Sequence, residues 1–198
     1  RVAAYASIAM HWMPEILYRF RRVCPDVDVD LRTVDHELEP FELLEKWRTD
    51  VIFAARQSGF ACDWTPLHDD KMYAILPAEY PTQGRDYFPI EEFEGKEFLM
   101  PYGRVDIEVR AAFEKNGVKP VIRPCHVDDE TVIRMVGKGL GISMMAEMMI
   151  RGKLNGVRTL PIQPVASREL GMGMHAQAHM TEAIAQLRDC VLEFIQEL

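Results

Sequence analysis

The sequence predicts an α/β fold, in which strands and helices alternate along a chain of 198 residues. The run Val51-Ile-Phe-Ala-Ala55 is continuously apolar, which is typical of a parallel strand covered on both faces. Between such runs, apolar residues repeat at helical spacing. The hydrophobic content of 48% over this length is enough to bury a substantial core in one or two domains.

The first half reads as β-α-β-α-β, the order of an open α/β sheet. Strands are expected at 1–5, 27–31 and 51–55. Pro14 should lie near the first regular turn of the first helix or kink it, and Cys24-Pro25 should end that helix. The residues that repeat at helical spacing are Met10, Met13, Leu17 and Phe20, then Phe41, Leu44 and Trp47 after Pro40.

The second half continues the alternation. Strands are expected at 72–76, 97–100, 121–127, 140–145 and within 168–176. One helix should run from Asp106 to Asn116-Gly117, a second from Asp128 to Val136, and a third from Thr181. The last helix should turn its apolar residues inward: Ile184, Leu187, Val191, Phe194 and Ile195.

The stretch Val136-Gly-Lys-Gly-Leu-Gly-Ile-Ser143 has the composition of a phosphate-binding loop. Such a loop needs its glycines before a helix, where free N–H groups and the positive end of the helix dipole lie. Here the glycines follow a helix, since acidic capping residues at Asp128 open it and Val132, Ile133 and Val136 form its apolar face. The stretch therefore predicts a helix end and a following strand rather than a nucleotide site.

Charge and cysteine usage narrow the classes of partner. A net charge of −8 and a pI near 5.3 argue against binding nucleic acid phosphates with this chain alone. No run of about 18 apolar residues occurs, so no membrane span is expected. The chain starts at Arg1 without a signal-peptide layout, which suggests a piece of a longer protein. Its four separated cysteines form no C-x-x-C pair and suit a reducing cytoplasm.

Metal binding and catalysis are not expected. His175 and His179 are spaced i,i+4, but they straddle an expected strand end and helix start. Cys125 and His126, followed by Asp128, offer a nucleophile, a base and an orienting acid, yet on a strand the first two point to opposite faces. No convincing catalytic set emerges, so we expect neither an enzyme nor a cofactor.

Several segments together carry a family resemblance: Ser7-Ile-Ala-Met-His-Trp-Met-Pro-Glu-Ile-Leu17, Cys24-Pro-Asp-Val-Asp-Val29, Ala74-Ile-Leu-Pro77 with Pro81, and Val136 to Ser143. In order and spacing, the whole chain resembles the effector-binding domain of LysR-type transcriptional regulators. The resemblance implies a two-lobed fold like that of type II periplasmic binding proteins, with two crossing strands between the lobes. Lobe I would comprise residues 1–72 and 174–198, and lobe II residues 73–173.

A ligand in such sheets lies beyond the carboxyl ends of the strands, here after Tyr5, Leu31, Met100 and Val127. These loops offer hydroxyls, a helix start, an aromatic ring and an arginine, which suit a small ligand with an anionic end. The ligand-binding candidates in the cleft between the lobes are Ala6, Ser7, Ile8, Thr33, Met100, Tyr102, Gly103, Arg104, His126 and Asp128.

Each candidate has a structural alternative. Ser7 and Asp128 are good helix N-caps. Tyr102-Gly103 is also a common turn, and Arg104 is also suited to solvent or to an ion pair with Asp106. His126 would also fit as a hydrogen-bonded interior histidine.

The resemblance implies a cytoplasmic effector-sensing domain that controls transcription, a homodimer or tetramer that contacts DNA only through an N-terminal winged helix-turn-helix absent from this chain. The dimer would pack the helix at 10–23 against the helix at 128–136 of the other subunit. The alternative is a solute-binding protein of a transporter with the same fold. The identity of the effector does not follow from the sequence, because one fold serves many ligands.

Overall fold

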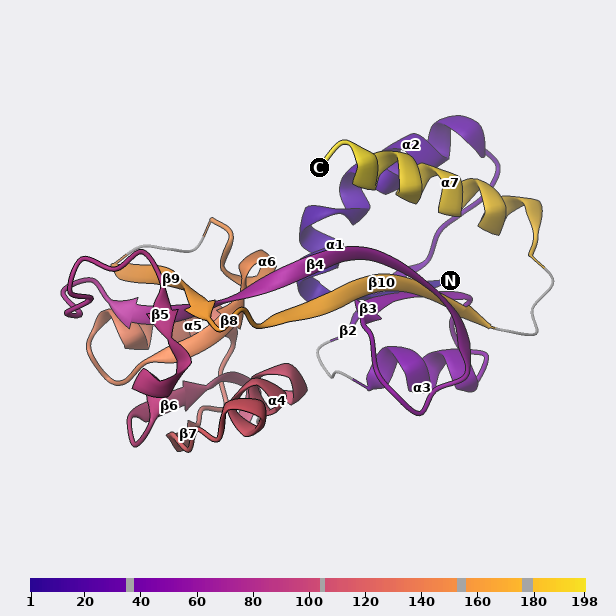
Figure 1. Ribbon diagram of the computed structural model, residues 1–198. Coiled ribbons are helices and arrows are strands. Elements are labelled where there is room, and N and C mark those ends of the chain that lie inside the picture. Colours follow the sequence, from indigo (N-terminus) through magenta and orange to yellow (C-terminus); the bar gives the residue numbers. More distant parts are fainter. Residues whose placement is uncertain (35–37, 104–105, 153–155, 176–179) are drawn as a thin grey trace. The chain divides into compact units, whose positions relative to one another are not determined.

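A computed structural model describes residues 1–34, 38–103, 106–152, 156–175 and 180–198. The chain forms two compact units (Figure 1). Unit 1 contains Arg1–Asp69 and Glu169–Leu198, and unit 2 contains Asp70–Arg168. Within the described residues, no helix is both long enough and apolar enough to cross a membrane.

Unit 1 is built on a parallel sheet. Strand β1 (Val2–Tyr5) lies between β2 (Leu31–Val34) and β3 (Val51–Ala55), and both pair with it in parallel. Strand β10 (Ser167–His175) then pairs with β3 in antiparallel orientation. Every residue of β1 and β3 is buried, as expected for strands covered on both faces.

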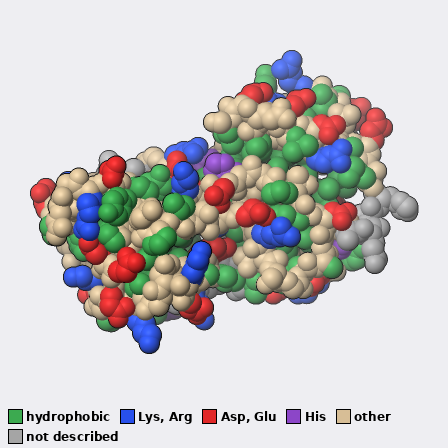
Figure 2. All heavy atoms as spheres, viewed as in Figure 1, with side chains coloured by type: hydrophobic (Ala, Val, Ile, Leu, Met, Phe, Trp, Pro, Cys, Tyr) green, Lys and Arg blue, Asp and Glu red, His purple; other side chains and the backbone are tan. Residues whose placement is uncertain are grey.

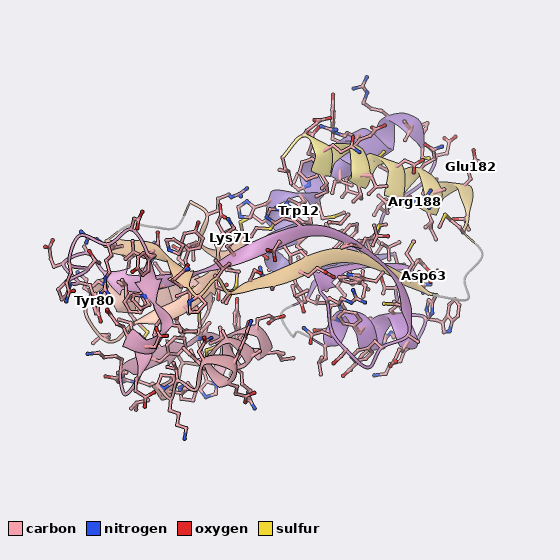
Figure 3. The ribbon with its side chains drawn as sticks, in the orientation of Figure 1. Trp12, Asp63, Lys71, Tyr80, Glu182 and Arg188 are labelled. Carbon is pink, nitrogen blue, oxygen red and sulfur yellow. The ribbon has the colours of Figure 1, made fainter. Side chains whose placement is uncertain are left out.

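Helices cover both faces of this sheet. Helices α2 (Met13–Val23) and α7 (Glu182–Gln196) lie side by side on one face, and α3 (Glu39–Glu45) lies on the other (Figure 1). The helix expected from Met10 is interrupted, because α1 (Ala6–His11) ends at Trp12 and α2 restarts with Pro14 in its first turn. Trp12 (Figure 3) is buried, with its ring centroid 6.0 Å from that of His68 and 6.4 Å from that of Phe194.

The position of β2 was predicted wrongly. The alternation in Val27-Asp-Val-Asp-Leu31 indicated a strand at 27–31, but only Leu31 of that stretch belongs to β2. The parallel register pairs Val2 with Leu31, and the N–H of Val2 donates to the carbonyl of Asp30 at 2.8 Å. Val27 instead follows a turn and is 41% exposed. Pairing with β1, rather than local alternation, therefore sets the start of the strand.

Unit 2 contains a mixed sheet and a smaller parallel pair. The second part of β4 (Cys62–Pro77) pairs in antiparallel orientation with β8 (Ser143–Ala146) and with β9 (Val157–Gln163). The short strand β5 (Phe88–Pro89) runs parallel to β9. Strands β6 (Glu97–Met100) and β7 (Val121–Pro124) pair in parallel, and β7 ends three residues before the position expected from the sequence.

The helices of unit 2 follow its strands. They are α4 (Ile107–Asn116), α5 (Asp129–Gly137), α6 (Glu147–Ile150) and the short 3-10 turns η1 (Ile90–Phe93) and η2 (Pro101–Gly103). The expected capping of α4 is confirmed: Asp106 accepts from two amides of its first turn, and Gly117 is left-handed with φ of 68°.

The glycine-rich stretch ends a helix, as predicted. Helix α5 stops at Gly137, and Gly139 adopts φ of 75° in the turn that leads toward β8. Gly141 is needed for a different reason, since a Cβ there would lie 2.9 Å from the carbonyl oxygen of Glu97. The glycines therefore allow a sharp turn and a close backbone approach, which is why the strand starts at Ser143 rather than Leu140.

An aromatic cluster fills the core of unit 2. The rings of Phe88, Phe93, Phe98 and Phe113 meet edge to face, with centroids 4.9 to 5.5 Å apart. All four side chains are almost fully buried. Strand β5 and turn η1 supply two of these rings, although neither element was predicted from the sequence.

Two long strands join the units. The chain leaves unit 1 within β4, after Asp69, and returns within β10, at Glu169. The resemblance implied lobe boundaries after residue 72 and before residue 174. Only 72–76 of β4 was predicted as a strand, because the half-exposed residues from Cys62 onward lack a continuous apolar run.

Candidate functional site

In unit 1, the candidate residues lie at the carboxyl ends of two parallel strands. Ala6, Ser7 and Ile8 form the first turn of α1, directly after β1. Thr33 is exposed in β2 and pairs in register with Ala4, one residue before the end of β1. The parallel pairing therefore brings these four residues to one edge of the unit 1 sheet.

Ser7 is not a helix cap. The N-cap position of α1 is Tyr5, so Ser7 lies inside the first turn, and it is partly buried. Ile8, one residue later, is fully buried and anchors the turn in the core. The capping alternative for Ser7 is therefore wrong.

In unit 2, backbone hydrogen bonds hold two post-strand segments together. The N–H of Cys125 donates to Met100 O at 2.7 Å, that of Gly103 to Cys125 O at 2.8 Å, and that of Tyr102 to Val127 O at 2.9 Å. Met100 is the buried last residue of β6, and the other groups follow β6 or β7. The carboxyl ends of both strands thus form one rigid corner.

The conformation of Tyr102-Gly103 brings His126 into this corner. Gly103 has φ of 71°, and a Cβ there would lie 2.2 Å from Nδ1 of His126, so the imidazole rests on the glycine backbone. Tyr102 is also left-handed, with φ of 57°, which is unusual for a residue with a side chain. Its ring is 38% exposed. His126 is exposed as well, so the interior alternative for this histidine is wrong.

Asp128 does cap α5. Its carboxylate accepts from the N–H of Thr131 at 2.8 Å, which satisfies one of the free amides of the first turn. Val132, Ile133 and Val136 bury the opposite side of this helix. The capping role of Asp128 is thus confirmed, and ligand contact would be an additional role. Arg104 lies outside the described residues.

A group of ionisable side chains that sequence reasoning missed lies in unit 2. Arg168 donates from Nε and Nη2 to Oδ2 of Asp70, at 2.9 and 2.8 Å, and both side chains are buried. Oδ1 of Asp70 accepts from the N–H of Met148 at 3.1 Å. The two partners are 98 positions apart in the chain, so no local sequence pattern indicates the pair.

Two acids at the start of α4 interact with this group. Burial, then the charge of Asp106 and a hydrogen bond with Asp106, raise the pKa of Glu108 to about 8. The charge of Arg168 acts in the opposite direction and limits the rise. Glu108 therefore keeps its proton to a higher pH than an exposed glutamic acid does.

His175 and Cys125, considered above for a metal site and for catalysis, both make other contacts. Among the described residues, no group of three or more His, Cys, Asp and Glu side chains could hold a metal ion. The ring of His175 stacks on Trp47 at 3.5 Å, while His179 lies outside the described residues. Cys125 is buried and donates weakly to Arg123 O at 3.5 Å, whereas His126 is exposed.

Comparison with known proteins identifies the domain type. The family model described as LysR substrate binding domain matches residues 1–196. The chain is 23% identical over 177 residues to the HTH-type transcriptional regulator TtuA of Agrobacterium vitis, covering 86% of this chain and 58% of that protein. It is 23% identical over 139 residues to the uncharacterised HTH-type regulator YybE of Bacillus subtilis (strain 168), covering 69% and 47%. The chain therefore spans about half the length of these relatives.

Solved structures share the fold. The CcmR regulatory domain of Synechocystis PCC6803, in complex with 2-PG, has a TM-score of 0.85 at 17% identity, covering 100% of this chain and 97% of that one. Full-length BenM has a TM-score of 0.85 at 18% identity, covering 100% and 67%. The effector-binding domain of QuiR, in complex with shikimate, has a TM-score of 0.82 at 15% identity, covering 99% and 96%. The predicted fold class, like that of type II periplasmic binding proteins, is thus confirmed.

Proposed function

The chain belongs to the family of LysR substrate-binding domains, and from this premise we propose that it is the effector-sensing part of a transcriptional regulator. Its ligand is a small anionic metabolite that binds at the strand ends that carry the candidate residues. The proposed lobes are 1–72 with 174–198, and 73–173. Binding of the metabolite controls transcription through a DNA-binding segment outside this chain.

The observation that carries the proposal is the clustering of polar groups at the carboxyl ends of parallel strands. Ser7 and Thr33 supply hydroxyls at this edge in unit 1. Tyr102 and His126 supply a phenol and an imidazole at the corresponding edge in unit 2. Open α/β sheets bind ligands at this edge, and a few convergent polar groups are what fix a small ligand there.

The remaining candidates have supporting roles. The backbone of Ala6, Ile8 and Gly103 can approach a ligand closely, and Met100 provides an apolar floor. Arg104 follows Gly103 and would offer a guanidinium fork to a carboxylate or phosphate. Asp128 would then orient a hydroxyl or amine of the ligand, in addition to capping α5.

The family match favours a regulator over a solute-binding protein of a transporter, because the named relatives are transcriptional regulators. A regulator acts where the DNA is, which supports a cytoplasmic location. The net charge of −8 supports DNA contact through an N-terminal winged helix-turn-helix rather than through this domain. On the face shown in Figure 2, acidic and basic side chains are interspersed, without an area of basic residues alone.

A thermal-shift screen tests the proposal. The library should contain small carboxylates, aromatic acids and phosphates, with a neutral amide or alcohol as the matched control for each acid. A ligand at 100 times its dissociation constant adds about 2.7 kcal/mol to the free energy of unfolding. We expect one class of anion to raise the melting temperature more than its neutral analogue does. If only neutral or cationic compounds stabilise the chain, the proposed ligand class is wrong.

A further inference from the structure

A cavity lies wholly within unit 1, beside the loop between β3 and β4. It has a volume of about 550 Å³, within the range of small-molecule sites. Its walls include Phe41, Arg56, Phe60, Cys62, Trp64 and Glu169. None of the effector-site candidates of unit 1 lines it. The cavity is therefore separate from the site proposed above.

One wall of the cavity is aromatic. The ring of Phe41, on α3, is buried, and its centroid lies 4.9 Å from that of Phe60 and 6.0 Å from that of Trp64. The planes of these pairs are inclined by only 31° and 26°. Phe60 and Trp64 are only partly buried. The rings of Phe60 and Trp64 therefore remain partly accessible, and each packs against the ring of Phe41.

The indole of Trp64 is held in a fixed position. Its Nε1–H donates to Oε1 of Glu169 at 2.9 Å. A Cβ on Gly171 would lie 2.5 Å from Cζ2 of the indole, so the ring lies directly against the backbone of β10. Only glycine permits this approach. The ring is thus oriented before any ligand arrives, which lowers the entropy lost on binding.

Arg56 provides a cation next to this wall. Its N–H donates to the carbonyl of Glu169 at 2.9 Å, which continues the pairing of β3 with β10. Its Nη1 lies 3.5 Å from Oε1 of Glu169, and its side chain is 62% exposed. A guanidinium has five N–H donors, so this long single contact leaves donors for another carboxylate. Glu169 positions both the indole and the guanidinium.

Among the residues that line the cavity Glu169 is acidic, and its carboxylate is already engaged by the Trp64 indole and the Arg56 guanidinium; the wall at Cys62 adds no further charge. Burial is the largest cause of a raised pKa at the Cys62 thiol, with the nearby charge of Asp63 acting in the same direction. The thiol therefore stays neutral, and it gives the cavity a polarisable apolar surface. Asp63 is labelled in Figure 3 beside the start of β4 and does not line the cavity.

We propose that this cavity is a second ligand site, which takes a small aromatic carboxylate. The ring of the ligand stacks on Phe60 and Trp64, and its carboxylate pairs with the guanidinium of Arg56. Stacking favours a flat ring over a saturated one. The planar guanidinium fork matches a carboxylate and gains nothing from a neutral amide.

Phenylacetate is a suitable probe, and the indole N–H signals of the ¹⁵N-labelled chain are a local readout. The chain has three tryptophans, and comparison with Trp64→Phe assigns the Trp64 signal. We expect phenylacetate to shift this signal saturably. Cyclohexylacetate, which lacks the aromatic ring, and 2-phenylacetamide, which lacks the charge, should bind more weakly.

Variants separate this site from the proposed effector site. Arg56→Gln should weaken phenylacetate binding by about tenfold or more, because a charge-assisted contact is lost. Arg56→Lys should lose less. Lys46→Gln is the matched control, because Lys46 also makes a long exposed ion pair, at 3.4 Å with Glu42, and does not line the cavity. It should bind as the parent chain does, and so should Ser7→Ala.

The proposal is overturned by either of two outcomes: the Trp64 signal does not shift up to the solubility limit of phenylacetate, or Arg56→Gln binds as tightly as the parent chain. If Ser7→Ala also loses affinity in the second case, the probe binds at the effector site instead. The melting temperature of Arg56→Gln shows whether the variant is folded, and its exposed side chain makes unfolding unexpected.

Discussion

At the scale of single residues, the buried pair of Asp70 and Arg168 is the most consequential contact in unit 2. Two charges have been removed from water; they compensate each other, the N–H of Met148 donates to Asp70, and the charge of Asp106 also acts on Arg168. Breaking one partner of such a pair leaves an uncompensated buried charge. The pair lies where β4 and β10 enter and leave unit 2, so it fixes both strands there.

Replacing Asp70 with asparagine tests this role. Asp70→Asn removes the carboxylate that the buried guanidinium of Arg168 contacts and should lower the free energy of unfolding by about 3–5 kcal/mol. Glu97→Gln breaks the exposed pair with Arg123 and serves as control, with an expected change of about 0–1 kcal/mol. Urea unfolding measures both. Equal losses in the two variants would show that the burial of Asp70 is not what matters.

Glu108 predicts a dependence of stability on pH. An acid whose pKa rises on folding binds its proton more tightly in the folded chain, so stability falls as pH rises from the unfolded value of about 4.3 to the folded value of about 8. Glu108→Gln is neutral at every pH and should flatten this fall. Glu130→Gln, which changes an exposed acid paired with Arg134, should not. The measurement is urea unfolding between pH ~5 and ~8. An unchanged slope in Glu108→Gln would contradict the assignment.

At the scale of secondary-structure elements, capping supports α5. Asp128→Ala removes the acceptor for the N–H of Thr131 and should cost about 0.5–2 kcal/mol of stability. Asp128→Asn retains an acceptor at the N-cap and should remain close to the parent chain. Thermal unfolding distinguishes the two. The same loss in both variants would mean that the negative charge, rather than the cap, stabilises the helix.

The elements also show what a sequence can predict. Strong local signals were enough for β3, a continuous apolar run, and for α4, which has both an acidic cap and a C-terminal glycine. Elements fixed by pairing were misplaced or missed: β2 starts where β1 pairs with it, β9 pairs with β4, and the short β5 pairs only with β9 among the described strands. In the candidate site, too, local signals were predictable and features set by longer-range contacts were not. Strand ends were predictable, but the stacking of His126 on Gly103 depends on a left-handed turn that no local pattern required.

At the scale of the whole molecule, family membership and exposed apolar residues suggest self-association. Met10 lies near the end of α1, Tyr18 lies within α2, and Val23 is the last residue of α2. Each of these side chains is more than half exposed. We propose that α2 of one subunit packs against α5 of another, within a homodimer or a tetramer built from it. In a two-fold symmetric dimer this contact forms twice, so α2 and α5 of both subunits are buried.

Light scattering of the chain at tens of micromolar tests the dimer. We expect the mass of a dimer, and Tyr18→Glu should shift the chain toward the monomer because it buries a charge in the apolar contact. Tyr87→Glu changes another exposed tyrosine, in unit 2 and outside both helices, and should leave the mass unchanged. A monomeric parent chain would contradict a strong dimer, and equal dissociation in both variants would point to a different interface.

The central claim is that one small anion binds at the strand ends that carry the candidate residues, and calorimetric titration tests it most directly. With the best anion from the screen, Ser7→Ala should weaken binding by a few-fold to about tenfold, the cost of one lost hydrogen bond. Arg104→Ala should weaken it more than Arg104→Lys does, since lysine keeps the charge but loses the fork. All three variants should melt near the parent chain. Unchanged affinity in Ser7→Ala and in Arg104→Ala alike would contradict the account and place the effector elsewhere.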